Sequence, residues 1–257
     1  MIDATAIVHP DARIGAEVSV GPYAIVGAHV EIGDGTRVGP HVVLQGPARL
    51  GRNNQIHPFC SIGGDPQDKK YRGESESRLE IGDGNVIREY CSINRGTVGG
   101  GGVTRVGSNN WIMAYVHIAH DCVIGDDTVL ANNATLAGHV DVEDCVILGG
   151  FTGVHQFCRV GRHSFSAISS VIVKDVPPYI LVSGNTAKPK GLNREGLKRR
   201  QFSDAEIEEL RKAYRIVYRE GLLLKDALEQ LAPLAASSAC VAHFVDFIQS
   251  SRRGIVR

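Results

Sequence analysis

Residues 12–44 read ARIGAEVSVGPYAIVGAHVEIGDGTRVGPHVVL, and an aliphatic side chain stands at every sixth position from Ile14 to Leu44. The spacing extends over 8–62, resumes over 81–93, and continues over 106–172, where only Ser166 is not aliphatic. Neither the 3.6-residue period of a helix nor the two-residue alternation of a strand keeps one position apolar for so long. The sequence is therefore built from hexapeptide repeats, and this period decides the fold.

Two further positions of the repeat support this interpretation. Two residues before the aliphatic position the side chain is small or β-branched, as at Ala24 and Thr36, and one residue after it glycine is frequent, as at Gly15 and Gly33. We expect each hexapeptide to form a short strand and a sharp turn, in which glycine meets the backbone demands of the turn. Three such strands make a triangular coil of 18 residues, with the aliphatic side chains stacked inside. The predicted fold class is mainly β.

Four of the six cysteines occupy the small inward position, and the chain has no CxxC pair and no zinc-finger spacing. We expect these four to fill the core and to have no redox or metal-binding role. They are Cys60, Cys91, Cys122 and Cys158.

Breaks in the repeat indicate how the chain is organised. Its frame slips by one residue twice, which predicts loops ejected from the coil near 63–80 and 94–105. The repeat ends near 175–178, and Ser203 to Glu206 is a capping-box start for a helix, with further helices expected around 224–232 and 239–250. We therefore predict a coil domain over 1–190 and a helical cap over 191–257.

Composition excludes several classes of protein. Lys plus Arg and Asp plus Glu balance at 28 each, so charge gives no argument for a nucleic-acid partner. The N-terminal residues have neither the basic region nor the apolar stretch of a signal peptide. No apolar run approaches the ~20 residues that span a bilayer. We expect a cytoplasmic protein without a membrane span.

The coil geometry brings one group of polar residues together. A coil of 18 residues stacks His120, Gly138 and Gln156 in one column, at the ~4.8 Å spacing of neighbouring strands. His139 follows the glycine and His155 precedes the glutamine, while His117 lies three residues before His120. An imidazole in such a cluster can act as a general base or bind zinc. The periodicity leaves both roles open.

Six segments resemble the UDP-N-acetylglucosamine acyltransferase family, and they occur in order along essentially the whole chain. They are HIAHDC at 117–122, NNATLAGHV at 132–140, VHQFC at 154–158, QDKKY at 67–71, DVPPY at 175–179 and NREGLKRR at 193–200. Hexapeptide repeats are shared by many acyltransferases, whereas these segments are specific to one family.

The resemblance implies a left-handed parallel β-helix with a C-terminal α-helical cap. It also implies a homotrimer with an active site in each cleft between subunits. Such an enzyme transfers an (R)-3-hydroxyacyl group from acyl carrier protein to the 3-hydroxyl of UDP-N-acetylglucosamine, the first step of lipid A biosynthesis. The carrier's phosphopantetheine holds the acyl group, so no separate cofactor and no metal is expected.

The resemblance also implies roles for individual residues. His120 would remove the proton of the sugar hydroxyl, the N–H of Gly138 would stabilise the oxyanion, and Asp121 would influence the base. Arg199 suits a diphosphate, because a guanidinium forms charge-assisted bonds to it. The full set of expected substrate-binding residues is Asp68, Lys70, His117, His139, His155, Gln156, Asn193, Glu195 and Arg199.

Some positions depart from the family pattern. Ile168 stands where members that take long acyl chains have glycine, so we expect a shorter groove and a decanoyl-like donor. Thr186 and Asn94 replace histidines of some relatives. On the helix that follows Ser203, a row of arginines (211, 215 and 219) is interpreted either as a contact for acyl carrier protein or as an ordinary solvated surface.

Three other functions compete with this hypothesis. The related N-acyltransferase of the same pathway carries an extra N-terminal domain, whereas the repeat begins here by Val8. A zinc hydratase of the carbonic anhydrase type would need three histidine ligands and would not use the basic residues 198–200. A non-catalytic scaffold would lose no activity when His120 is replaced.

Overall fold

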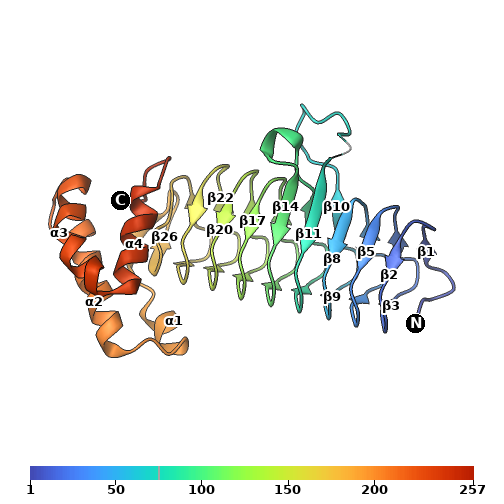
Figure 1. The fold of residues 1–257 in the computed structure, drawn as a ribbon, viewed down its shortest axis with the longest axis horizontal. Coiled ribbons are helices and arrows are strands. Elements are labelled where there is room, and N and C mark those ends of the chain that lie inside the picture. The colour runs from blue at the N-terminus through green and yellow to red at the C-terminus, as the bar shows by residue number, and fades with distance from the viewer. Residues whose placement is uncertain (75) are drawn as a thin grey trace.

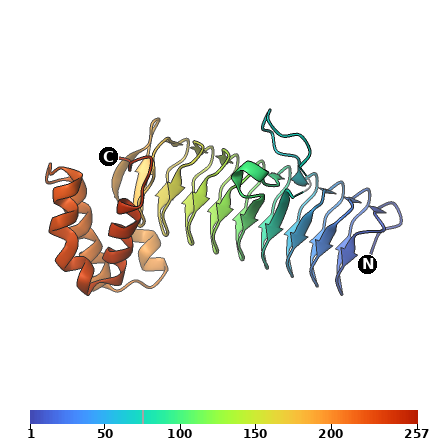
Figure 2. The same cartoon turned by 45° about the horizontal axis from the view of Figure 1, so that its top comes forward.

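A three-sided coil runs through most of the molecule and ends against a group of helices (Figure 1). This computed structural model describes residues 1–74 and 76–257; residue 75, within the loop predicted near 63–80, lies outside the described residues. Successive short strands belong to three different sheets in turn, which form faces 1, 2 and 3 of the coil. Figure 2 shows the strands of one face lying side by side along the axis of the coil.

All strands of faces 1 and 2 pair in parallel, as do those of face 3 except the last pair. Face 1 comprises β1 (Ile7–Val8), β4 (Ile25–Val26), β7 (Val43–Leu44), β10 (Ser61–Gly64), β13 (Ser92–Asn94), β16 (His117–Ile118), β19 (Thr135–Leu136), β22 (Gly153–Val154) and β25 (Val171–Ile172). Face 2 comprises β2 (Arg13–Ile14), β5 (Val30–Ile32), β8 (Ala48–Leu50), β11 (Arg78–Ile81), β14 (Val103–Val106), β17 (Val123–Ile124), β20 (Asp141–Val142) and β23 (Arg159–Val160). Face 3 comprises β3 (Ser19–Val20), β6 (Arg37–Val38), β9 (Gln55–Ile56), β12 (Val86–Ile87), β15 (Trp111–Ile112), β18 (Val129–Leu130), β21 (Ile147–Leu148), β24 (Phe165–Ser166), β26 (Ile180–Ser183) and β27 (Lys188–Leu192).

The strand register confirms the predicted coil of 18 residues. Ile118 pairs with Leu136, and Leu136 pairs with Val154, so equivalent residues of successive coils lie side by side. The aliphatic position is buried in nearly every repeat, and the four cysteines expected as core filler are buried free thiols. Ser166, the one exception to the aliphatic pattern, is also buried. Its hydroxyl forms a 2.8 Å hydrogen bond with Thr152, so the polar atom has a partner inside the coil.

The role predicted for the glycines that follow the aliphatic position is wrong. Gly15 and Gly107 do not have positive φ; the left-handed conformation falls two residues later, at Glu17 and Asn109. A Cβ on Gly107 would lie 2.3 Å from the Asp126 carboxylate of the next coil. These glycines are therefore needed because adjacent coils approach closely, not because the turn demands an unusual backbone.

Both predicted loops are present, and both leave the coil at the same place. The first follows β10 and precedes β11, and the second follows β13 and precedes β14 and contains the short helix η1 (Val98–Gly100). Both therefore join face 1 to face 2 (Figure 1). We call this the loop edge: the loops 65–77 and 95–102 together with the turns 119–122, 137–140 and 155–158.

The coil extends beyond the end predicted near 175–178, because β26 pairs with β24 and then turns back antiparallel onto β27. The capping box at Ser203 is confirmed. The helices are α1 (Arg194–Arg199), α2 (Asp204–Tyr218), α3 (Leu224–Ser237) and α4 (Ala239–Gln249). The basic residues 198–200 belong mostly to α1. Within the described residues, none of the helices combines the length and apolarity that crossing a membrane requires.

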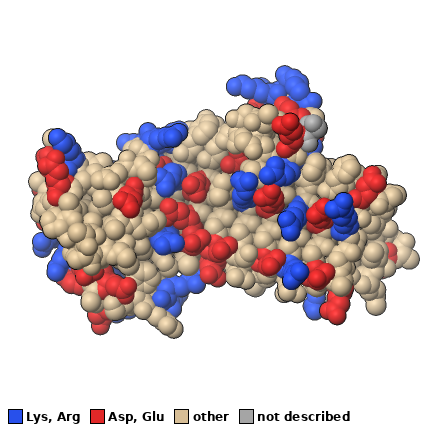
Figure 3. Space-filling model, in the orientation of Figure 1, with Lys and Arg blue, Asp and Glu red and all other residues tan. Residues whose placement is uncertain are grey.

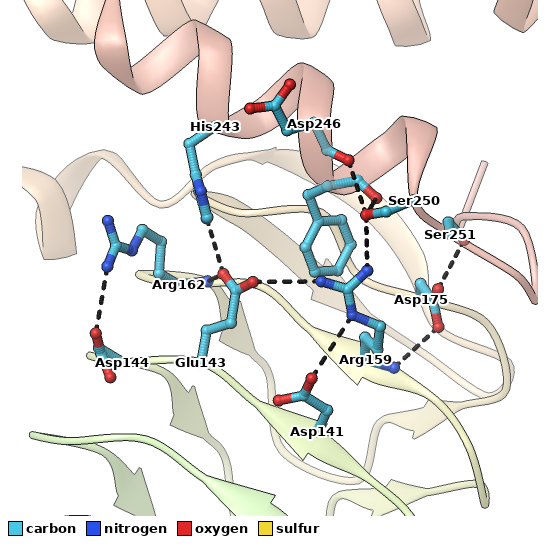
Figure 4. Close-up of polar contacts among 11 residues, drawn as sticks. Asp141, Glu143, Asp144, Arg159, Arg162, Asp175, His243, Asp246, Ser250 and Ser251 are labelled. Atoms are coloured by element: carbon cyan, nitrogen blue, oxygen red, sulfur yellow. Dashed lines mark hydrogen bonds and ion pairs between the residues drawn. The ribbon is translucent and has the colours of Figure 1, made fainter.

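A polar network fastens α4 to the end of the coil (Figure 4). The Glu143 carboxylate accepts a 2.9 Å hydrogen bond from His243 of α4 and lies 3.5 Å from the guanidinium of Arg159. Arg159 also donates to the Ser250 hydroxyl at 3.0 Å. Burial acts to raise the pKa of Glu143, but the hydrogen bonds from His243 and the backbone of Arg162 outweigh it and lower the pKa. The cap is thus held in a fixed position on the last coils.

The stacked core makes a prediction about stability. Ile124 is 2% exposed, whereas its neighbour Val123 points outward and is 41% exposed. We expect Ile124→Ala to lower the free energy of unfolding by about 2–5 kcal/mol, because it leaves a cavity between coils. Val123→Ala, the matched control, should change it by roughly 0.5 kcal/mol or less. Denaturant unfolding of both variants tests this, and equal losses would contradict the inward assignment.

Candidate active site

The imidazole of His120 is hydrogen-bonded to the carboxylate of Asp121 in the turn 119–122 of the loop edge. His120 Nδ1 lies 2.8 Å from Asp121 Oδ2, and the Asp121 side chain is fully buried. The two residues are neighbours in sequence, which argues against contact in a strand, but Asp121 has φ +59° and so lies in a turn. The left-handed backbone lets both side chains meet.

The Asp121 carboxylate is surrounded by donors. Oδ1 accepts from the N–H of Thr97 at 2.8 Å, and Oδ2 accepts from the Thr97 hydroxyl at 2.6 Å. Burial acts to raise the pKa of Asp121, but hydrogen bonds from His120 and Thr97 outweigh it and hold the pKa below its ordinary value. The carboxylate is therefore ionised at neutral pH.

An ionised carboxylate can only accept hydrogen bonds, and this fixes the tautomer of His120. Nδ1 must carry the proton that points to Asp121, so Nε2 is left with a free lone pair. An imidazole held in this way can take a proton from a hydroxyl group at Nε2.

Gly138 lies directly beside that nitrogen, in the column that the sequence predicts. A Cβ on Gly138 would stand 2.6 Å from Cε1 and 2.7 Å from Nε2 of His120, so only glycine fits without moving the ring. Among the described residues, the N–H of Gly138 has no hydrogen-bond acceptor. A free backbone donor next to a base is the arrangement that stabilises an oxyanion.

Two further histidines complete the cluster. The His139 ring meets the His120 ring edge-on at 5.2 Å and stacks on Phe157 at 4.5 Å, with its Nε2 3.7 Å from Asp121 Oδ2. Burial lowers the pKa of His139 although Asp121 acts to raise it. Burial, with His120, also lowers the pKa of His117, whose Nδ1 lies 2.7 Å from the Ser92 hydroxyl. Burial therefore favours the neutral form of both rings.

The other residues predicted for the site at the loop edge are more exposed to solvent. Asp68 is half-buried and its charge reaches His139, whereas Lys70, His155 and Gln156 are exposed. Basic side chains gather at the first loop, above the coil (Figure 3). Asn94, at the base of the second loop, is buried and donates to the Asp65 carbonyl at 2.9 Å, which ties the two loops together.

The expected nucleotide-binding residues lie elsewhere in the protomer. Asn193, Glu195 and Arg199 line a cavity of about 280 Å³ between α1 and face 3. Asn193 caps α1 and donates to the His163 carbonyl at 2.9 Å; burial lowers the pKa of His163 to about 4. Face 3 does not border the loop edge, so the structure does not bring this group to His120 within one chain.

Other sequence predictions concern the surface. Ile168 is 70% exposed and lies in a turn between faces 3 and 1. Of the predicted arginine row, Arg211 pairs with Glu208 and Arg215 with Glu220, while the guanidinium of Arg219, at the end of α2, lies 5.8 Å from the centre of the Tyr214 ring.

The ligand atoms of His120, Asp121 and His139 lie within 4.8 Å of one another, so they could hold a metal ion. Both carboxylate oxygens of Asp121 already accept hydrogen bonds from Thr97, and Nδ1 of His120 faces the carboxylate. This donor set favours a base with its carboxylate over a ligand set that is open to a metal.

Thr97, which holds both oxygens of the Asp121 carboxylate, is a residue of this site that sequence reasoning did not find. Its loop is marked by the second frame slip, and the shared edge indicates that some loop residue lies near His120. No sequence signal identifies which one, since a threonine in a loop is common.

Known proteins are similar over the full chain. Residues 175–256 match the family model described as Udp N-acetylglucosamine O-acyltransferase, domain 2, and residues 11–46 and 104–138 match bacterial transferase hexapeptide repeats. Two curated relatives bear the name acyl-(acyl-carrier-protein)–UDP-N-acetylglucosamine O-acyltransferase. The protein of Thiobacillus denitrificans is 59% identical and that of Alkalilimnicola ehrlichii 56%; each alignment covers 100% of this chain and 99% of the relative.

Two solved structures have the same fold as this chain. LpxA from Acinetobacter baumannii has a TM-score of 0.97 at 45% identity, and UDP-N-acetylglucosamine O-acyltransferase from Moraxella catarrhalis has 0.97 at 48%; each covers 100% of this chain and 99% of the solved one. The coil is thus the expected left-handed parallel β-helix with a helical C-terminal region. The chain belongs to the UDP-N-acetylglucosamine O-acyltransferase family and is an acyltransferase.

Proposed function

We propose that the chain transfers an (R)-3-hydroxyacyl group from acyl carrier protein to the 3-hydroxyl of UDP-N-acetylglucosamine, with His120 as general base. One observation carries the mechanism: an imidazole paired with a buried carboxylate stands beside the unpaired N–H of Gly138. The names of the full-length relatives support the two substrates. The reaction would be the first step of lipid A biosynthesis.

The reaction follows from these positions. Nε2 of His120 accepts the proton of the sugar hydroxyl as its oxygen attacks the thioester carbonyl and a C–O bond forms. The N–H of Gly138 donates to the oxyanion of the tetrahedral intermediate. Collapse of the intermediate breaks the C–S bond, and the protonated His120 gives its proton to the leaving thiolate, which becomes the free thiol. The products are the acylated sugar nucleotide and the free carrier thiol.

The placement of the two residue groups supports a site shared between subunits. The base lies on the loop edge, whereas Asn193, Glu195 and Arg199 lie at face 3 of the same chain. One substrate can contact both groups only if a second copy supplies one of them. The homotrimer expected for this family, with a site in each cleft between subunits, would meet that requirement.

Replacement of the base tests the function. His120→Ala should lower kcat by at least about 100-fold, the range for loss of a general base, while the oligomer remains folded. The assay follows acyl transfer from a hydroxyacyl-carrier thioester to UDP-N-acetylglucosamine. His29→Ala, an exposed histidine in another turn between faces 1 and 2, is the control and should keep full activity. Unchanged turnover in His120→Ala would refute the mechanism, and zinc-dependent activity would favour a hydratase.

The contact between Gly138 and His120 allows a second test. Gly138→Ala should lower kcat by about 10–100-fold, because the new Cβ would lie 2.7 Å from Nε2 and must displace the ring. Gly153→Ala, on the next coil of face 1, adds a methyl with nothing within 4 Å and should leave kcat unchanged. Similar activity in both variants would show that the glycine at 138 has no special role.

Ile168 tests the proposed limit on acyl length. If its exposed side chain closes the acyl groove, Ile168→Gly should raise kcat/KM for a myristoyl-like donor relative to a decanoyl-like one by roughly 10-fold or more. Competition between the two donors, with purified enzyme, measures the ratio. An unchanged preference would reject a measuring role for Ile168.

A further inference from the structure

We infer that the second ejected loop, 95–102, is a brace for the Asp121 carboxylate, and that Thr97 is the positioning residue through which it orients His120. This inference rests on the proposed function of His120 as the base. Thr97 need not touch substrate; it acts on the base through Asp121.

Thr97 holds both oxygens of the carboxylate at once. Its N–H donates to Oδ1 at 2.8 Å and its hydroxyl donates to Oδ2 at 2.6 Å, while His120 Nδ1 approaches Oδ2 at 2.8 Å. From the other side, the N–H of Asp121 donates to the Thr104 hydroxyl at 2.8 Å. With both oxygens fixed, the carboxylate has one orientation, and this orientation presents Oδ2 to the imidazole.

The rest of the loop is shaped around the same carboxylate. A Cβ on Gly100 would lie 2.2 Å from the Asp121 carboxyl group, so the loop backbone passes directly over it. Gly100 and Gly102 both donate their N–H to the Thr97 carbonyl, at 2.9 and 2.7 Å, and this closes the turn on Thr97. The Asp121 side chain has no exposed surface as a result.

The burial makes the brace chemically important. A buried carboxylate without donors would favour protonation, and a neutral Asp121 could no longer require the proton on Nδ1 of His120. Burial acts to raise the pKa of Asp121, and the hydrogen bonds from His120 and then from Thr97 outweigh it and keep the carboxylate ionised. Part of the anion's hydrogen-bonding capacity is also used by Thr97, which moderates how strongly Asp121 stabilises a protonated His120.

Substitutions at position 97 test the brace. Thr97→Val keeps the backbone donor and the side-chain shape but removes the hydroxyl. We expect kcat to fall about 10-fold with KM for both substrates unchanged, and Thr97→Ser to restore most of it. Oδ2 would then have His120 as its only side-chain donor and would stabilise the protonated ring more. The acidic limb of the kcat/KM profile should therefore move to higher pH.

The other titratable groups near His120 are unchanged in this variant. His117 and His139 face the ring, and Asp68 acts on His139. Imidazole resonances of His120, followed by NMR across pH, should shift in the same direction as the rate profile. This readout does not depend on turnover, and a merely structural role for Thr97 would not move it.

Two neighbouring glycines provide a matched pair. Gly100→Ala pushes a methyl into the Asp121 carboxyl group and should lower kcat by about 10-fold or more. Gly99→Ala adds the same methyl one residue earlier, where nothing lies within 4 Å, and should behave as wild type. Both substitutions change the same loop, so a difference between them reports the contact with Asp121.

The outcomes separate the brace from the proposed function. If His120→Ala abolishes transfer but Thr97→Val and Gly100→Ala keep the wild-type kcat and pH profile, the brace is refuted and the base stands. A lower kcat in Thr97→Val with an unchanged pH profile also refutes it, since the loop would then act by another route. If the wild-type enzyme transfers no acyl group, the proposed function fails, and the NMR titration alone decides whether Thr97 orients His120.

Discussion

Parallel pairing of equivalent residues on successive coils, 18 positions apart where no loop intervenes, is the constraint on which the rest of the structure depends. It stacks equivalent side chains in columns along the coil, so Ile118, Leu136 and Val154 fill the interior together. The same pairing places His120 next to Gly138 on the outside. One register therefore produces both the core and the site, and a shift by a single residue would destroy both.

A perfectly regular repeat would give the coil the same turns along all three of its edges. The site depends on the loops inserted at one of them, the loop edge. The two insertions both fall between faces 1 and 2, on the coils immediately before the turn that carries His120. Because β13 pairs directly with β16, the loop that follows β13 lies beside the turn that follows β16 on the next coil. The loop edge thus brings Thr97 to a carboxylate 24 residues away in sequence.

The sequence predicted the parts of the molecule that depend on periodicity. The repeat predicted the coil, its two loops and the column of His120 and Gly138, because each follows from counting residues. It could not predict the bond between His120 and Asp121, since alternation in a strand places neighbours on opposite sides and only the left-handed turn at Asp121 brings them together. The hydrogen bonds from Thr97 to Asp121 could not be predicted either, because the path of a loop does not follow from the repeat. The prediction that the glycines after the aliphatic position serve the turn was wrong, because these glycines are required by the close contact between one coil and the next.

Missing side chains shape the site as much as those that are present. At Gly138 the absence of a Cβ lets the imidazole lie against the next coil and leaves a backbone N–H open beside Nε2. At Gly100 it lets the loop press onto the Asp121 carboxyl group and exclude water from it. Exclusion of water strengthens the pairing of carboxylate and imidazole, and under the proposed function the N–H of Gly138 would give the developing oxyanion a donor that needs no rearrangement. In the proposed mechanism the two glycines therefore act on opposite sides of His120: Gly100 keeps the carboxylate behind the ring dry, and Gly138 keeps the space in front of it free for substrate.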